Sequence, residues 1–339
     1  LIMSGLSLAI YWIGAILINQ AGMVNKITYF SDMIVFSQYA VQVIMSFMML
    51  VMIFIMLPRA SVAANRINEV LDTKPTIIDG NREEGNKDCI GEVEFRNVSF
   101  RYPDAEEDVI KNISFKAKKG ETVAIIGSTG CGKSTVINLI PRFYDVTEGE
   151  VLVDGVNVRE YTQKALRNKI GYISQKATLF TGSIRSNVVF GDNGRTPADE
   201  EELKKAVDTA QAAEFVENLS NTYDGYVAQG GSNFSGGQKQ RISIARAIAR
   251  KPEIFIFDDS FSALDYKTDR VLRKQLDKEC SDSTRIIVAQ RIGTIRDADK
   301  IIVLDEGEIV GLGRHDELMK NCEVYQQIAL SQLSKEELA

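Results

Sequence analysis

The sequence predicts a chain in two parts, an α-helical membrane segment of two transmembrane helices followed by a soluble α/β domain. Its composition changes sharply near residue 60, where a run rich in Met, Ile, Val and Phe gives way to frequent charged residues. From residue 92 onward, short apolar runs alternate with helical segments. This alternation is typical of a mostly parallel sheet whose strands are buried on both faces.

Two uncharged stretches predict the membrane helices. Residues 1–18 and 33–58 carry no charged side chain, and they approach or exceed the roughly 20 residues that a spanning helix needs. The polar stretch 19–32 predicts a short connecting loop. The alternative is a pair of buried core helices in a soluble protein, but the uninterrupted apolar length favours membrane spans.

Basic residues predict the orientation of the second span. Arg59 and Arg66 follow it, and short flanks enriched in basic residues stay on the cytoplasmic side. Good helix formers continue to residue 72, so we expect residues 1–72 to hold both spans and a cytoplasmic extension of the second helix. Residues 73–91 combine proline, glycine and many charges, which predicts a linker.

The α/β domain is predicted over residues 92–331, followed by a C-terminal tail at 332–339. No low-complexity segment and no internal repeat interrupts its pattern. Strands are expected at apolar runs of four or five residues, namely 122–126, 170–173, 254–257, 285–289 and 301–304.

The composition argues against a nucleic-acid binder or a secreted protein. The chain carries 46 acidic and 40 basic residues and a net charge of −6, whereas nucleic-acid binders present a basic face. Its four cysteines are far apart and lack metal-ligand spacing, which indicates a reduced, cytosolic setting. The chain begins inside an apolar run without a basic n-region or a cleavage site, so we expect the C-terminal part of a longer polypeptide rather than a signal peptide.

A phosphate-binding loop is predicted where a strand ends and a helix begins. Residues 122–135 contain Gly-x-x-x-x-Gly-Lys-Ser, whose glycines let the backbone wrap phosphates and whose exposed N–H groups attract negative charge. Lys133 would reach the β- and γ-phosphates of a nucleotide, and Ser134 would bind Mg²⁺. A chance glycine-rich turn is the alternative, against which the flanking strand and helix argue. The candidate nucleotide-binding residues are Gly127, Ser128, Thr129, Gly130, Cys131, Gly132, Lys133, Ser134 and Thr135.

A second glycine motif carries a family resemblance. Residues 234–238 read Phe-Ser-Gly-Gly-Gln and precede an amphipathic helical stretch. Together with the phosphate loop, this motif resembles the ABC transporter ATPases, whose signature reads Leu-Ser-Gly-Gly-Gln. The resemblance implies that the signature faces the γ-phosphate bound by the other subunit. That role falls to Ser235, Gly236, Gly237 and Gln238.

The resemblance covers almost the whole chain and implies further site residues. Tyr102 matches the aromatic residue that stacks on adenine, and an ordinary strand aromatic is the alternative for this residue alone. Gln175 matches the glutamine that contacts Mg²⁺ and senses the membrane domain, and Asp258 matches the carboxylate that holds Mg²⁺ through water. Ser262 and Asp265 belong to the loop that crosses the dimer interface. ATP and Mg²⁺ are therefore the implied cofactors.

The membrane segment is similar to that of the family's exporters. Two spans joined directly to the ATPase look like the last two of the six helices in a half-transporter, whereas importers usually carry their membrane domain on a separate polypeptide. The resemblance implies a P-loop ATPase domain with an antiparallel β subdomain and a helical subdomain. It places this domain on the cytoplasmic side of a cell membrane, which we expect to be bacterial. The implied partners are a second half-transporter, membrane lipid and a small lipophilic or amphipathic substrate.

Two substitutions distinguish the predicted ATP site from the family pattern. The family carries a catalytic glutamate and a switch histidine where this chain has Asp259 and Gln290. Asp259 is one methylene shorter, and a misplacement of about 1 Å can slow a reaction on the order of 10²-fold. Gln290 is never cationic, and the single histidine, His315, follows the switch region. Asp259, Gln290 and Lys133 are the candidate catalytic residues.

A signature that departs from the family only at Phe234, beside an altered catalytic site, predicts an asymmetric dimer. In the family's head-to-tail dimer, each ATP lies between one subunit's phosphate loop and the other subunit's signature. Asp259 and Gln290 therefore affect only this chain's own site. The combination resembles the degenerate-site member of heterodimeric multidrug exporters. Tolerated variants in a slow but working site are the alternative.

Polar residues in the second span form a candidate substrate path. Gln38, Gln42 and Ser46 recur every four residues, which places them on one helix face. Polar residues inside a span usually face protein or a water-filled path. A neighbouring stripe of methionines would give an adaptable apolar surface for lipophilic cargo. Ordinary helix packing explains the same pattern.

Three rival functions accompany the exporter hypothesis. The first is a homodimeric lipid or peptide exporter with slow turnover. The second is a soluble ABC ATPase of the DNA-repair or translation type, which would lack fused spans. The third is a non-transporting channel or regulator, for which the sequence offers no positive sign.

Overall fold

The chain divides into two units, with the boundary between Thr76 and Ile77. The computed structural model describes residues 2–332. Within the predicted linker, residues from Ile77 onward belong to the second unit, where the Gly80 N–H donates to the Tyr161 carbonyl oxygen at 2.9 Å. The predicted tail at 332–339 lies outside the described residues except for Gln332.

The first unit, here called the helical unit, is a pair of long helices. Helix α1 (Ile2–Gln20) and helix α2 (Asn25–Asp72) are both long and apolar enough to cross a membrane, by length and composition. The predicted loop at 19–32 is wrong in its extent, because α2 already begins at Asn25. The charged side chains near the start of α2 are exposed, so they do not oppose helix formation there. The expected continuation of the helix to residue 72 is confirmed.

A glycine lets the two helices approach closely. Gly14 of α1 faces Met33 of α2, and a Cβ atom at Gly14 would lie 2.3 Å from the Met33 Sδ atom. A turn stabilised by the Asn25 N–H, which donates to the Gly22 carbonyl oxygen at 2.9 Å, connects the helices. The apolar side chains of α2 are mostly exposed, as a helix in contact with lipid or with further helices requires.

The second unit, here called the α/β unit, contains two main sheets. The larger has the order β12-β11-β3-β10-β9-β6, and all its pairs are parallel except β12 with β11. The smaller is antiparallel in the order β2-β1-β4-β5, and a short pair joins β7 to β8. The strands are β1 (Val93–Phe100), β2 (Ile110–Ala117), β3 (Thr122–Gly127), β4 (Glu148–Val153), β5 (Val156–Asn157), β6 (Ile170–Ile173), β7 (Gly182–Ser183), β8 (Tyr226–Val227), β9 (Ile254–Asp258), β10 (Thr284–Val288), β11 (Lys300–Asp305) and β12 (Glu308–Gly313).

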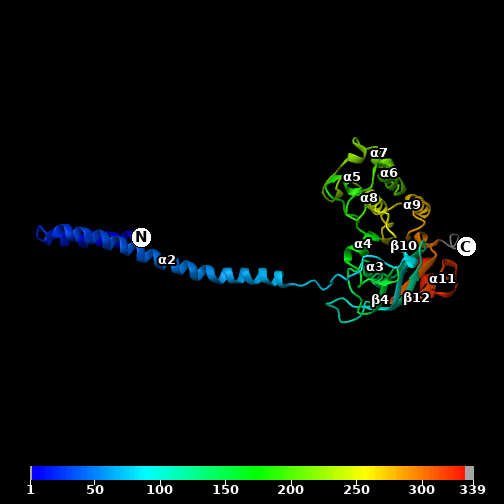
Figure 1. The fold of residues 1–339 in the computed structure, drawn as a ribbon, viewed down its shortest axis with the longest axis horizontal. Coiled ribbons are helices and arrows are strands. Elements are labelled where there is room, and N and C mark those ends of the chain that lie inside the picture. The colour runs from blue at the N-terminus through cyan, green and yellow to red at the C-terminus, as the bar shows by residue number, and fades with distance from the viewer. Residues whose placement is uncertain (1, 333–339) are drawn as a thin grey trace. The chain divides into compact units, whose positions relative to one another are not determined.

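All five predicted strands are found, as β3, β6, β9, β10 and β11 of the larger sheet. Within the α/β unit, helices α5 to α9 gather at one end and β4, β12 and α11 lie at the other (Figure 1). The helices are α3 (Lys133–Leu139), α4 (Gln163–Asn168), α5 (Ile184–Val188), α6 (Glu200–Thr209), α7 (Ala213–Glu217), α8 (Gly236–Ala249), α9 (Tyr266–Glu279), α10 (Ile292–Ile295), α11 (His315–Asn321) and α12 (Glu323–Gln332).

The larger sheet separates two hydrophobic cores, because successive side chains of a strand point to opposite faces. On β3, Val123 and Ile125 pack with the smaller sheet, whereas Ala124 and Ile126 pack against the helical layer. The β9 residues alternate in the same way. This double burial explains why these strands appear in the sequence as uninterrupted apolar runs.

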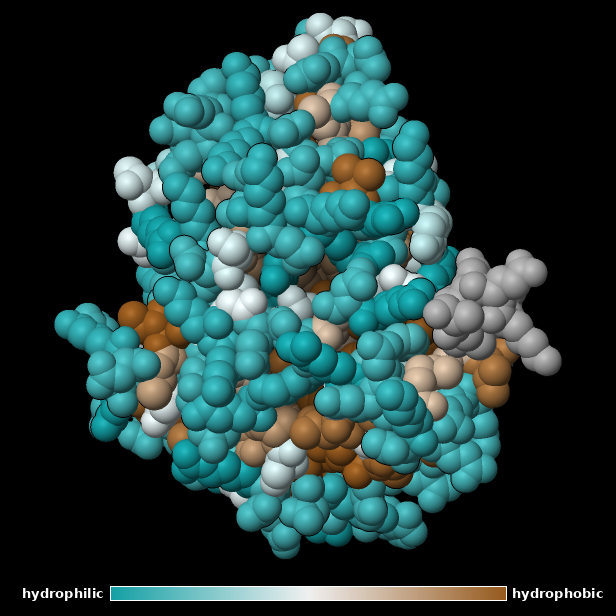
Figure 2. Space-filling view, turned by 90° about the vertical axis from the view of Figure 1, so that its right-hand side faces the viewer, coloured by the Kyte–Doolittle hydropathy of each residue, from teal (hydrophilic) through white to brown (hydrophobic). Residues whose placement is uncertain are grey.

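The face of the α/β unit seen in Figure 2 is mostly hydrophilic, with hydrophobic residues confined to small patches. This surface contrasts with that of α2, where the side chains of Met52 and Phe54 are 63% and 68% exposed. The described face of the α/β unit is thus hydrophilic, whereas α2 exposes apolar side chains.

Candidate nucleotide-binding site

The phosphate loop connects β3 to α3, and two glycines give it its shape. Gly130 and Gly132 have φ angles of 87° and 97°, in the left-handed region that favours glycine. A Cβ atom at Gly132 would lie 2.6 Å from Ile110 Cγ2, whereas one at Gly130 would meet open space. The loop therefore needs glycine at Gly132 for both backbone conformation and packing. Of the other predicted loop residues, Ser128 and Thr129 are exposed and Cys131 and Thr135 are buried.

Lys133 and Ser134 begin α3, and both are engaged within the site. The Lys133 ammonium group donates to the carbonyl oxygens of Gly127 at 2.9 Å and Ser128 at 2.6 Å. Ser134 Oγ donates to Asp258 Oδ1 at 3.0 Å, which joins the phosphate loop to the end of β9. Hydroxyl and carboxylate oxygens are suitable ligands for Mg²⁺, so Ser134 and Asp258 fit this ion. Mg²⁺ there would take its remaining ligands from nucleotide phosphates and water, since it usually keeps several waters.

Tyr172 is a site residue that the sequence analysis missed. Its Oη atom lies 3.0 Å from Asn138 Oδ1 and 3.3 Å from Asp258 Oδ2. Burial, followed by the charge of Asp258, raises the pKa of Tyr172, so the phenol stays protonated and can donate to that carboxylate. The available signal was its place on β6, next to β9, the strand that ends in Asp258.

Tyr102 lies beside the phosphate loop, as the resemblance implies. Its Oη atom is 3.1 Å from Thr135 Oγ1. Its ring meets the rings of Tyr144 and Phe100 edge to face, with centroids 5.1 Å and 4.9 Å away. An aromatic cluster at this place can stack on a nucleobase, and such stacking contributes to nucleotide affinity.

Asp259 is held by two amide groups. Its Oδ2 atom accepts a hydrogen bond from Gln290 Nε2 at 2.8 Å and another from Gln175 Nε2 at 3.0 Å. Its backbone has a φ angle of 47°, in the left-handed region that aspartate tolerates better than most residues. Burial raises the pKa of the Asp259 carboxyl, and the hydrogen bond from Gln175 opposes that shift. Gln175 thus contacts Asp259, next to the Mg²⁺-type donors Ser134 and Asp258.

The signature residues form the start of α8. Ser235 caps this helix, with Ser235 Oγ accepting from the Gln238 N–H at 3.3 Å. Gln238 Oε1 in turn accepts from the Ser235 N–H at 2.9 Å. Phe234, the departure from the family signature, is buried and packs edge to face on Phe215. A Cβ atom at Gly236 would meet nothing within 4 Å, so this glycine is open on the side where its side chain would be.

The predicted interface loop is hydrogen-bonded to the residue next to the Mg²⁺-type donors, Asp259. Ser262 Oγ donates to the Asp259 carbonyl oxygen at 2.7 Å. Asp265 caps α9 and accepts from the Thr268 N–H at 3.0 Å. Hydrogen bonds from Thr268 lower the pKa of Asp265, which keeps the cap ionised. Ser262 is therefore bonded directly to Asp259, whereas Asp265 is bonded to the first turn of α9.

The candidate substrate-path residues lie on α2 in the helical unit. Gln38, Gln42 and Ser46 are all exposed, and Ser46 Oγ donates to the Gln42 carbonyl oxygen at 2.9 Å. Gln42 and Ser46 line a hollow with apolar neighbours that include Phe47. The polar face is thus continuous with an apolar surface.

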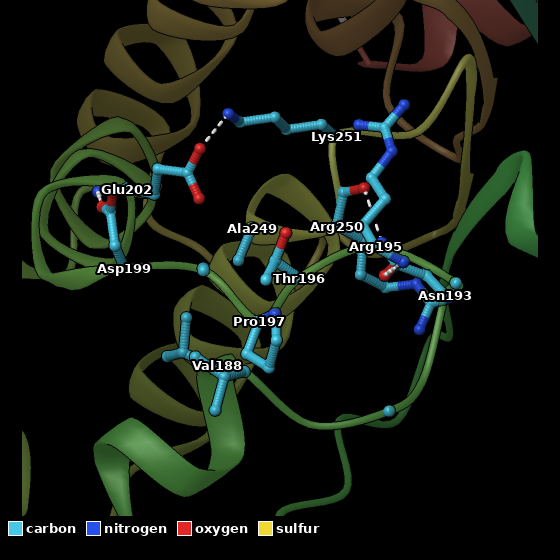
Figure 3. A pocket seen from close by; sticks show the side chains of 14 residues that line it. Val188, Asn193, Arg195, Thr196, Pro197, Asp199, Glu202, Ala249, Arg250 and Lys251 are labelled. Atoms are coloured by element: carbon cyan, nitrogen blue, oxygen red, sulfur yellow. Dashed lines mark hydrogen bonds and ion pairs between the residues drawn. The ribbon is translucent and has the colours of Figure 1, made fainter.

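A second hollow of about 630 Å³ lies in the α/β unit, lined by residues 188–199 and the end of α8. Lys251 pairs with Glu202 across it, and Asn193 Nδ2 donates to the Arg250 carbonyl oxygen at 3.0 Å (Figure 3). It includes none of the residues predicted from the sequence to bind nucleotide. The phosphate loop, with its converging hydroxyl and carboxylate groups, is the chemically competent site.

Comparisons with known proteins agree with the geometry of the phosphate-loop site. A family model described as ABC transporter matches residues 110–262. The chain is 42% identical over 327 residues to an uncharacterized ABC transporter ATP-binding protein of Mycobacterium tuberculosis. This alignment covers 96% of this chain and 55% of that protein. The chain is 44% identical over 229 residues to a putative multidrug export ATP-binding/permease protein of Bacillus subtilis, which covers 68% of this chain and 39% of that protein.

A solved structure shows the same architecture. The structure of a bacterial Atm1-family ABC exporter with ATP bound matches with a TM-score of 0.77 and 32% identity, over 90% of this chain and 53% of that one. The chain thus spans about half the length of the Mycobacterium relative and of this exporter.

Proposed function

Since the chain belongs to the ABC transporter family and is of the exporter type, we propose that it is the ATP-binding, membrane-spanning subunit of a heterodimeric exporter. Its own ATP site is degenerate, and its signature completes a competent site on a different partner chain. The cargo is a lipophilic or amphipathic molecule moved outward across a cell membrane. The two amide hydrogen bonds on Asp259 are the observation that carries this proposal.

Hydrolysis requires a carboxylate that aligns a water molecule on the γ-phosphorus. Here the carboxylate is shorter than glutamate by one methylene, and its Oδ2 atom already accepts from Gln175 and Gln290. Gln290 cannot become cationic, so it cannot place a positive charge near the γ-phosphate as a protonated histidine can. The groups expected to hold the phosphates and Mg²⁺, namely Lys133, Ser134 and Asp258, are all in place at the phosphate loop and the end of β9, which supports ATP binding.

The signature supports the second half of the proposal. Ser235 and Gln238 form a reciprocal cap, so the first turn of α8 is rigid without any ligand. A rigid, open helix start with Gly236 unobstructed is suited to contact a phosphate bound by another subunit. The chain would thus contribute to hydrolysis at its partner's site while holding ATP at its own.

The test compares two variants of the full-length chain, each purified with its partner half-transporter. D259N should leave ATP turnover within about twofold of wild type, because this carboxylate does not drive the productive site. G236D should reduce turnover on the order of 10²-fold, because it places a carboxylate against the partner's γ-phosphate without crowding this chain. Loss of turnover in D259N, or brisk turnover by a homodimer of this chain, would contradict the proposal.

A further inference from the structure

The segment that carries Gln290 is held by a residue far along the chain. Gln332, in α12, accepts a hydrogen bond from the Ile292 N–H at 2.9 Å through its Oε1 atom. Its Nε2 atom donates to the Gln290 carbonyl oxygen at 2.7 Å. One amide group therefore bridges the two main-chain positions on either side of Arg291. The residues from Gln290 to Ile295 are called the switch segment below.

Helix α12 is a fixed support for this amide. Tyr325 and Ala329 of α12 are fully buried, and Tyr325 Oη lies 2.8 Å from His315 Nδ1 of α11. Ile292, at the start of the switch segment, is fully buried as well. The contact between Gln332 and the switch segment thus joins two elements that are each anchored in the helical-layer core.

Two side chains of the switch segment reach the ATP site and the predicted interface loop. The Gln290 amide donates to Asp259 Oδ2 at 2.8 Å. The Arg291 guanidinium donates to the carbonyl oxygens of Ser262 at 3.3 Å and Leu264 at 3.4 Å, in the predicted interface loop. Further along the segment, the Gly293 carbonyl oxygen accepts from Arg273 at 3.1 Å and Thr294 Oγ1 donates to Asp269 at 3.2 Å, both in α9. A movement of the backbone at Gln290 would disturb the contacts to Asp259, to this loop and to Gln332 together.

We propose that Gln332 is a positioning residue that latches the switch segment, so that α12 regulates how tightly this chain's site holds ATP. The inference rests on the proposed function, in which Gln290 and Asp259 line this chain's ATP site. When ATP draws the Gln290 amide from Asp259 toward the γ-phosphate, the backbone of the switch segment moves and the two bonds to Gln332 break. The latch therefore opposes ATP binding, and by linkage bound ATP loosens the contact between α12 and the switch segment.

The test uses the full-length chain with its partner, whose own phosphate-loop lysine is replaced by alanine so that ATP binding reports this site. Q332L removes both bonds, and we expect the Kd for ATP to fall on the order of tenfold, because the hydrogen bonds that hold the ATP-free switch segment are lost. Q332E keeps an acceptor for the Ile292 N–H but loses the donor to Gln290, so the fall in Kd should be smaller. Amide hydrogen exchange at Ile292 should rise in Q332L by a similar factor.

Q327L is the matched control. Gln327 lies on the same helix and is exposed, and within residues 2–332 its side chain hydrogen-bonds to Glu323 of α12 and not to the switch segment. It should leave both the Kd and the exchange at Ile292 unchanged. Weaker or unchanged ATP binding in Q332L would overturn the latch, since a merely structural loss weakens binding and a latch strengthens it when removed. This outcome is independent of D259N turnover, so failure of the degenerate-site proposal is recognised separately.

Discussion

Restoring the family's catalytic pair should raise hydrolysis at this chain's own site, and both substitutions are needed for the full effect. D259E adds one methylene and moves the carboxylate toward the γ-phosphate. Correcting a placement error of about 1 Å is worth on the order of 10²-fold in rate. Q290H supplies an imidazole in place of the amide that now donates to Asp259 Oδ2.

The structure explains why D259E alone falls short of this gain. The longer carboxylate would still find the amides of Gln290 and Gln175, which lie 2.8 Å and 3.0 Å from the present Oδ2 atom. A hydrogen bond to a charged group contributes about 1.5–3 kcal/mol, and about 1.4 kcal/mol is a factor of ten. The retained Gln290 bond should therefore cancel at least about tenfold of the gain in hydrolysis rate. We expect D259E to raise the rate about tenfold and the double variant about 100-fold.

The assay is phosphate release by the full-length chain paired with a partner whose catalytic glutamate is replaced by glutamine. In that background, turnover reports the site built on Asp259. Adding D258N to the double variant should return the rate to background, because Asp258 and Ser134 form the Mg²⁺-type donor pair. A double variant no faster than D259E would refute the role given to Gln290. A 100-fold gain from D259E alone would refute the restraint by the amides.

Three further predictions concern binding and stability. Y102A should weaken ATP binding by about 1–3 kcal/mol, the usual contribution of base stacking, as measured by titration with a fluorescent ATP analogue. G132A should lower the free energy of unfolding more than G130A by about 1–3 kcal/mol in chemical denaturation, because only the first Cβ atom meets Ile110. Burial lowers the pKa of His315, so the unfolded chain binds more protons in acid. The contribution of His315 to the free energy of unfolding should therefore be fully present above about pH 6.5. It should fall below that pH by at most about 1.4 kcal/mol per pH unit, as followed by melting temperature.

Each of these three has a defined contrary outcome. Y102F should bind ATP nearly as wild type, and equal losses in Y102A and Y102F would show that the hydroxyl contact to Thr135 matters rather than the ring. Equal losses in G130A and G132A would mean that backbone strain alone decides both sites. For His315, H315Q should flatten the acid limb of the melting curve, and an unchanged limb would assign the pH dependence to other groups.

The sequence predicted the strands well because the larger sheet is buried on both faces. Phe255 and Phe257 pack on one side and Ile254 and Ile256 on the other, so the whole run is apolar and easily recognised. The polarity of residues 19–32 predicts a longer loop between α1 and α2 than the structure has. Charged side chains at the exposed start of a helix do not interrupt the helix, and α2 begins at Asn25.

The phosphate loop could be named from its own motif, and the signature, Asp258, Asp259 and Gln290 from the resemblance of their motifs to those of the family. Tyr172 could not be assigned in this way, since its role comes from β6 lying next to β9. Gln332 gave no signal at all, because 42 residues separate it from Gln290.

The sequence by itself predicted which groups the ATP site contains and which family groups it lacks. Only the tertiary structure decided what the substituted groups do, because hydrogen bonds between distant segments depend on packing that no local pattern encodes. The fold brings Gln175, Gln290 and Asp259 to one oxygen atom and sets Gln332 behind the switch segment. Asp259 and Gln290, the two residues that depart from the family pattern, are therefore hydrogen-bonded to each other and to their neighbours.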